Sequence, residues 1–128
     1  MKLLLDTHVW IWLLQSPERL GTRTKVELGD TKNELWVSPI STWEALMLHR
    51  KKRIKLSSDF LAWLQQSTPG FHPAPFTHEI VLAAERLDLH ADPADRFLAA
   101  TAQVLELTLV TADRHLLGLG NIRTMANR

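Results

Sequence analysis

Short apolar runs that end directly at the start of a helical segment are the strongest constraint on how this chain folds. Three runs are apolar nearly throughout and too short for helices: Lys2–Leu5, Leu35–Val37 and Leu107–Val110. Such runs are typical of strands that are buried on both faces of a parallel sheet. Their alternation with helical segments predicts an α/β fold with a mostly parallel central sheet.

Helical segments fill most of the sequence between these runs. Capping residues, proline and glycine breaks and apolar spacing predict helices over residues 7–15, 22–32, 41–51, 57–66, 77–87, 92–106 and 113–117. Trp43, Leu46 and Met47 are expected on the apolar side of the 41–51 helix, and the polar 22–32 helix has Val26 and Leu28 as its few apolar positions. A brief strand is expected within 71–74 and an edge strand over 121–125. No repeat or linker divides the chain, so we expect one domain over residues 1–128.

Four acidic residues lie where an apolar run meets a helix. Asp6 follows the first run, Glu44 follows the second, Asp95 opens a long helix and Asp113 follows the third run. Because loops at the carboxyl ends of parallel strands converge on one crevice, these carboxylates should lie together. Two like charges about 5 Å apart repel by roughly 3 kcal/mol at an effective dielectric near 20. A divalent cation would relieve that repulsion, and oxygen ligands without Cys favour Mg²⁺ or Mn²⁺ over zinc.

Two of these residues have structural explanations that need no metal ion. Ser41 and Glu44 have the spacing of a capping box, in which both side chains stabilise a helix start. Asp92 suits the N-cap before Pro93, and Asp95 in the first turn would then complement the helix dipole. The local sequence leaves both interpretations open.

Asp113 also has a structural explanation that needs no metal ion, whereas Asp6 does not. Thr111 or Asp113 can serve as the cap of the short helix that follows the third run. Asp6 ends a buried strand and has no basic neighbour in sequence. A buried carboxylate is costly unless it is paired or binds a metal ion, so Asp6 points most directly to a functional site.

The histidines and tryptophans give weaker indications. No histidines form an HExxH pattern or another close pair, so most are expected at the surface or in loops, with His8 set apart because it nearly adjoins Asp6. The histidines are His8, His49, His72, His78, His90 and His115.

The five tryptophans are expected in the core or in subunit contacts rather than as base-stacking platforms. Trp10 and Trp12 are two residues apart, so one of them should face a partner chain.

Composition narrows the functional classes. The chain is 45% hydrophobic and 23% charged with a net charge of +1, which is ordinary for a globular protein. No apolar stretch approaches the length of a membrane span, and the lack of Cys suits a reducing cytoplasm, where we expect the protein. A dense basic run occurs at Arg50, Lys51, Lys52, Arg53 and Lys55. It is either a solvated helix end or, if it lines the acidic crevice, a phosphate contact.

Four sequence motifs contain these acidic residues. They are Leu4-Leu5-Asp6-Thr7-His8-Val9-Trp10, Ser38-Pro39-Ile40-Ser41-Thr42-Trp43-Glu44, Asp92-Pro93-Ala94-Asp95-Arg96-Phe97-Leu98-Ala99-Ala100-Thr101-Ala102 and Leu109-Val110-Thr111-Ala112-Asp113. In this order the motifs resemble a PIN domain and, more narrowly, a VapC-type toxin of a bacterial toxin–antitoxin pair. The resemblance implies a three-layer α/β/α sandwich and a Mg²⁺- or Mn²⁺-dependent ribonuclease. It also implies a homodimer that is inhibited by a small antitoxin protein of the VapB type.

Carried over by position, the resemblance assigns the site residues. Asp6, Glu44, Asp95 and Asp113 match the acidic quartet of the family, and Asp92 matches an additional acidic position. Asp6 and Asp95 are expected to bind the principal metal ion, with Glu44 and Asp113 holding a second ion or ordering its waters. A separate set is expected to hold the phosphates of the RNA: Arg96, Arg50, Lys51, Lys52 and Arg53.

The leading hypothesis is therefore an endoribonuclease toxin that cleaves RNA phosphodiester bonds with a metal-activated water and is neutralised by its antitoxin. A metal-dependent nuclease that acts on DNA or flap structures is a second hypothesis. A non-catalytic α/β binding module is a third. The chain has no GxGxxG or Walker pattern of glycines, which argues against a nucleotide-binding module.

Overall fold

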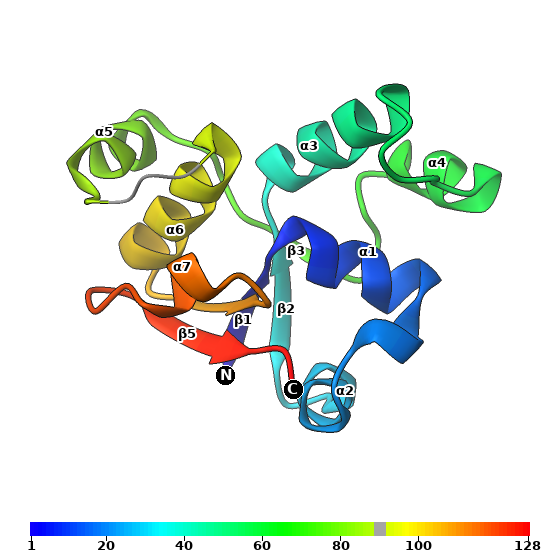
Figure 1. Ribbon diagram of the computed structural model, residues 1–128, viewed down its shortest axis with the longest axis horizontal. Helices are drawn as coiled ribbons and strands as arrows, with labels where there is room; N and C mark the ends of the chain where they lie inside the picture. The colour runs from blue at the N-terminus through cyan, green and yellow to red at the C-terminus, as the bar shows by residue number, and fades with distance from the viewer. Residues whose placement is uncertain (89–91) are drawn as a thin grey trace.

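The computed structural model describes residues 1–88 and 92–128, so His90 lies outside the described residues. The strands are β1 (Lys2–Leu5), β2 (Glu34–Val37), β3 (His72–Pro73), β4 (Thr108–Thr111) and β5 (Arg123–Ala126). They form one sheet in the order β3-β2-β1-β4-β5, in which every pairing is parallel (Figure 1). Leu4 of β1 pairs with Trp36 of β2 on one side and with Leu109 of β4 on the other. The chain therefore places β1 at the centre of the sheet.

Helices cover both faces of this sheet and complete three layers (Figure 1). They are α1 (Thr7–Gln15), the 3₁₀ helix η1 (Pro17–Arg19), α2 (Thr22–Gly29), α3 (Pro39–Arg50), α4 (Ser58–Leu64), α5 (His78–Arg86), α6 (Pro93–Leu105) and α7 (Arg114–Leu117). The expected α/β/α sandwich is confirmed. Within the described residues, no helix has the length and hydropathy to cross a membrane.

The apolar run of β1 is explained by these two helical layers. Leu3 and Leu5 pack into a core with residues of α1, α2, α3 and α4, whereas Leu4 packs with residues of α5, α6 and α7. All three leucine side chains are fully buried. Because successive residues of a strand point to opposite faces, only a strand covered on both sides needs an unbroken apolar run. The same burial holds Asp6, the next residue, close to the interior.

The predicted capping box at the start of α3 is wrong. The helix begins at Pro39, and the Ser38 hydroxyl caps it by accepting a hydrogen bond from the Ile40 amide at 3.0 Å. Ser41 is fully buried inside the helix, where its Oγ accepts a hydrogen bond of 3.1 Å from the Thr7 hydroxyl. Ser38 has the advantage because Pro39 suits the first helical position. Helix capping therefore does not explain Glu44.

One residue that was predicted on the apolar side of its helix is exposed. Trp43 is 58% exposed, whereas of the two apolar positions of α2, Leu28 is buried and Val26 is 65% exposed. The buried residues of α3 are Ser41, Glu44 and Ala45, which share one face of the helix, so Trp43 lies outside that face. The helix predicted over 22–32 ends at Gly29.

Replacing the observed cap should weaken α3 without disturbing the core. Ser38→Ala should lower the free energy of unfolding by about 1 kcal/mol, because it removes the acceptor for an otherwise unpaired amide. Thr42→Ala, in the same helix but without a capping role, is the matched control and should cost less. Urea unfolding of both variants measures the difference. Equal stability of Ser38→Ala and the parent protein would contradict the assignment of the cap.

Candidate active site

Four segments bring carboxylates to the edge of the sheet where its strands end. Asp6 directly follows β1, Asp113 follows β4, Glu44 lies in the second turn of α3 and Asp95 in the first turn of α6. In Figure 1, α1 continues directly from the end of β1. The four residues, together with Asp92, line one cavity of about 420 Å³. His8 and Trp12 of α1 form an adjoining part of its wall.

Asp6 is the best-anchored of these carboxylates. It is only 7% exposed, and each of its carboxylate oxygens accepts one hydrogen bond. The Thr7 amide donates to Oδ1 at 2.7 Å, and the Thr111 hydroxyl donates to Oδ2 at 2.6 Å. Burial raises the pKa of Asp6, whereas these two hydrogen bonds and the nearby His8 oppose that rise. The bonds fix the orientation of the carboxylate while leaving each oxygen a lone pair for a further partner.

Thr111 also connects Asp6 to Asp113. Its Oγ1 accepts a hydrogen bond of 3.0 Å from the Asp113 amide while donating to Asp6. The Asp113 side chain, which is 35% exposed, caps α7 by accepting from the His115 amide at 2.8 Å. Asp113 is therefore both a helix cap and a member of the acidic cavity. The sequence indicated Thr111 as a possible cap and as part of the Thr-x-Asp step of the fourth motif, but not its hydrogen bond to Asp6.

Asp95 carries the clearest sign that the carboxylates repel each other. Its pKa is raised to about 7, first by burial and then by the charges of Asp6, Glu44, Asp113 and Asp92. Position in the first turn of α6 would by itself stabilise the ionised form through the helix dipole. The observed direction is opposite, so burial and like charges outweigh the dipole.

Glu44 and Asp92 face the same cavity without the helix-end bonds that the sequence suggested. Glu44 is 9% exposed, and no hydrogen bond to its carboxylate is present within residues 1–88 and 92–128. Asp92 occupies the N-cap position of α6, but its side chain makes no capping hydrogen bond. Neither carboxylate therefore makes a hydrogen bond that stabilises a helix end.

The donor set fits a hard divalent cation, although the side chains are not arranged around one. Every acidic group that lines the cavity offers oxygen, the ligand that Mg²⁺ and Mn²⁺ prefer. In the part of the chain that the structure describes, no three His, Asp or Glu side chains are placed so that they could hold an ion. Binding would therefore require carboxylates to turn toward each other, which their charges oppose until a cation enters.

The expected RNA-binding residues lie outside this cavity. The Arg96 guanidinium donates to the carbonyl oxygens of Ala84 at 2.7 Å and Glu85 at 3.3 Å, which ties α6 to the end of α5. The basic run Arg50–Arg53 begins at the last residue of α3, beyond Glu44 along the helix. Contacts of either group with RNA stay predictions.

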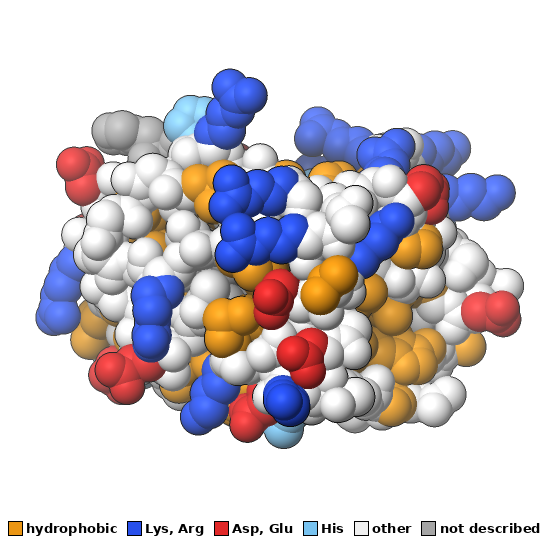
Figure 2. All heavy atoms as spheres, turned by 90° about the horizontal axis from the view of Figure 1, so that it is seen from below, with side chains coloured by type: hydrophobic (Ala, Val, Ile, Leu, Met, Phe, Trp, Pro, Cys, Tyr) orange, Lys and Arg blue, Asp and Glu red, His pale blue; other side chains and the backbone are white. Residues whose placement is uncertain are grey.

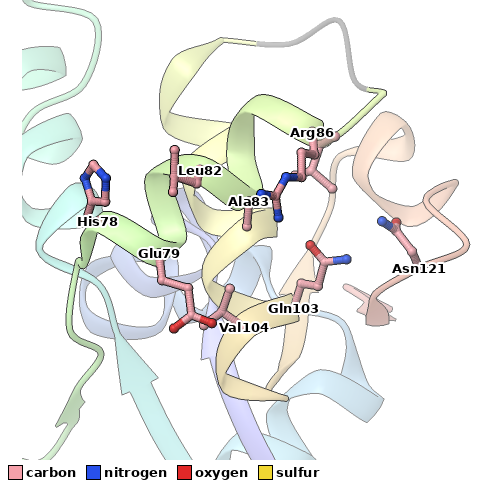
Figure 3. Close-up of a pocket in the computed structure, with 9 residues that line it drawn as sticks. His78, Glu79, Leu82, Ala83, Arg86, Gln103, Val104 and Asn121 are labelled. Carbon is pink, nitrogen blue, oxygen red and sulfur yellow. The ribbon is translucent and has the colours of Figure 1, made fainter.

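A second cavity, of about 500 Å³, lies between α5, α6 and the segment before β5 (Figure 3). Arg86, Gln103 and Asn121 come from those three segments, and Glu79 of α5 is the one carboxylate among the described residues that line it. The cavity lacks the grouped carboxylates that would bind a metal ion, so it is not a candidate catalytic centre.

The opposite end of the molecule carries side chains of both charges. Figure 2 shows the side from which β1 begins, where Lys and Arg side chains gather in the upper part of the view and most acidic side chains lie below them. A polyanion is attracted most strongly by a stripe of one sign. The acidic cavity is therefore the most distinctive chemical feature that we find.

Comparisons with known proteins show the family to which the chain belongs. A family model described as PIN domain matches residues 3–121. Ribonuclease VapC22 of Mycobacterium tuberculosis is 36% identical over 115 residues, which is 88% of each chain.

Solved structures with the same fold are more distant in sequence. A structure of VapBC2 from Rickettsia felis bound to a promoter DNA fragment matches with a TM-score of 0.73 and 17% identity, covering 98% of both chains. A toxin–antitoxin complex from Klebsiella pneumoniae matches with a TM-score of 0.69 and 18% identity, covering 98% of this chain and 97% of that one.

The extent of the family match and the identity to a curated relative show that this chain belongs to the PIN domain family. Within the family it is of the VapC type, as the four sequence motifs suggested.

The raised pKa values predict an unusual dependence of stability on pH. Between the ordinary Asp pKa of 3.8 and the folded value of about 7, folded Asp95 binds more protons than unfolded Asp95. In EDTA, the free energy of unfolding should therefore rise as pH falls through 7 toward 4, and be lost as pH rises through 7. The raised pKa of Asp6 acts in the same direction.

Urea unfolding at closely spaced pH values, with Asp95→Asn as the control, measures this effect. The substitution should remove much of the pH dependence across that window. A parent protein that only loses stability on mild acidification, with the same slope in Asp95→Asn, would contradict carboxylate coupling.

Proposed function

We propose that this protein is a metal-dependent endoribonuclease toxin. The observation that carries the proposal is the convergence of four carboxylates from distant segments on one cavity, with the pKa of Asp95 raised to about 7 by burial and by its neighbours. A protein with no need for cations at this edge would gain stability by neutralising these groups. Similarity to a ribonuclease at 36% identity supports RNA as the substrate class.

The residues of the chain have separable tasks in this proposal. Asp6 and Asp95 would hold the principal Mg²⁺ or Mn²⁺, with Glu44 and Asp113 binding a second ion or orienting water. The Thr111 and Thr7 hydrogen bonds keep Asp6 in one orientation, so the other carboxylates would turn toward it around a cation. A bound cation would hold Asp95 as a carboxylate, in place of the proton.

A divalent cation in this cavity would supply Lewis acidity, which activates water and offsets charge on the phosphate. No histidine is needed as a general base in this scheme. The hydroxyl of Thr111 and the burial of Asp6 serve to position the acidic groups rather than to react.

An antitoxin of the VapB type is the proposed protein partner. VapBC complexes and a toxin–antitoxin complex share this fold over nearly the whole chain, which motivates the proposal. A homodimer is also proposed. Leu82 and Val81 of α5 are exposed apolar residues that a partner chain could cover.

Two alternative functions make different predictions. A DNA or flap nuclease would use the same carboxylates but would cleave matched DNA at least as well as RNA. A non-catalytic binding module would retain the fold yet cleave neither nucleic acid. The grouped, partly protonated carboxylates favour catalysis, because a binding module has no use for a strained acidic cavity.

Cleavage assays test the proposed activity. Purified protein with Mg²⁺ or Mn²⁺ should cleave single-stranded RNA, and EDTA should abolish cleavage. Asp6→Asn should lower the rate about 100-fold or more, since several kcal/mol of charge stabilisation would be lost. Asp59→Asn, an acidic residue of α4 outside the cavity, is the matched control and should cleave normally. Cleavage that persists in EDTA or in Asp6→Asn would contradict the proposal.

Metal binding should also be visible as stabilisation of the folded protein. At 100 times its dissociation constant, a cation that binds only the folded state adds about 2.7 kcal/mol to the free energy of unfolding. Thermal and urea unfolding with and without Mn²⁺ measure this gain, and Asp6→Asn should lose most of it. Equal stabilisation of the parent and Asp6→Asn would place the ion elsewhere.

A further inference from the structure

The catalytic cavity has an aromatic wall that the acidic residues do not explain. His8 and Trp12, four residues apart on α1, lie on the same side of the helix and both line the cavity. Their ring centroids are 6.0 Å apart, and the ring planes are tilted by 52°. Trp10 is fully buried and packs on Phe60 with ring centroids 5.4 Å apart. The core of this layer therefore uses Trp10, whereas Trp12 presents part of its surface to the cavity.

A cation adjoins this wall. The Cζ atom of Arg19, in η1, lies 5.9 Å from the centroid of the Trp12 ring. The backbone of Arg19 is fixed, because the Asn127 side chain donates to its carbonyl oxygen at 3.0 Å. Its guanidinium is exposed and forms no ion pair with any described residue. The head group is therefore free to exchange the indole for an anion without unfolding η1.

The charge of the cavity makes this position useful. Five acidic residues line the cavity and would repel the phosphates of an approaching RNA strand. Arg19 is a cation beside the wall, whereas the basic run Arg50–Arg53 starts at the far end of α3. An aromatic surface next to an exposed guanidinium is the combination that binds unpaired nucleotides, since the base stacks and its phosphate is neutralised.

We propose that Trp12, His8 and Arg19 form a nucleotide subsite beside the four carboxylates. An unpaired base of the RNA stacks on the Trp12 indole next to His8, and Arg19 moves from the ring to the adjoining phosphate. This inference rests on the proposed ribonuclease function and adds the residues that set the register of the strand. A base in a duplex would have to unpair and unstack before it could stack on Trp12, which costs free energy. The subsite therefore selects single-stranded RNA.

Cleavage of random-sequence single-stranded RNA in Mn²⁺, with the products sequenced, tests the subsite. Trp12→Leu should raise KM about ten-fold or more and should flatten the base preference at one position flanking the cut. Trp12→Phe, which keeps a stacking surface, should restore most of both. Trp43→Leu is the matched control, because that exposed tryptophan lies outside the cavity, and its KM and base preference should equal those of the parent.

Arg19→Gln tests the phosphate contact separately. The slope of log affinity against log salt concentration should become shallower by about 0.7, as expected for one lost contact to a single strand. Melting temperatures of all variants check that α1 is still folded, and Trp12→Phe keeps the test decisive if Trp12→Leu unfolds.

The outcomes separate the subsite from the activity itself. If the parent protein cleaves RNA while Trp12→Leu and Arg19→Gln keep its KM, base preference and salt slope, the subsite is wrong and the ribonuclease stands. If those variants cleave normally but resist inhibition by the antitoxin, the wall binds the protein partner and the subsite is again overturned. A parent protein that cleaves no RNA overturns both.

Discussion

Repulsion between carboxylates that a parallel sheet gathers at one edge is the constraint on which this site depends. Asp6 cannot move away, because β1 is buried in both cores and the Thr111 and Thr7 groups hold its oxygens. Asp95 relieves part of the repulsion by keeping its proton up to a pH of about 7. The protein thus maintains an arrangement that costs stability, as is common where a site is built for a ligand.

Much of the fold follows from local patterns in the sequence. Leu3–Leu5 had to be a strand covered on both faces, and the parallel sheet follows from the alternation of such strands with helices. Two predictions were wrong for the same reason: the cap of α3 and the burial of Trp43. Ser38 and Ser41 are both plausible caps, and Trp43 and Leu46 are both apolar. Only packing against other segments decides which serine caps the helix and which apolar side chain is buried.

The site was predictable to the extent that it depends on where strands end. The positions of Asp6, Glu44, Asp95 and Asp113 at junctions suggested that they would meet, and they line one cavity. The hydrogen bonds that hold these carboxylates in place could not be predicted. Thr111 and Asp6 are 105 residues apart in sequence, and no local pattern reveals a hydrogen bond over that separation. For the same reason Trp12 was expected in the core or in a subunit contact.

The central claim is that the carboxylates share a cation pocket. An anomalous difference map from crystals of the metal-free protein soaked in Mn²⁺ tests it most directly. We predict a peak in the cavity within bonding distance of the Asp6 and Asp95 oxygens, with Glu44 or Asp113 turned toward it. A map with no peak in this cavity, or with Mn²⁺ bound only elsewhere on the molecule, would contradict the account.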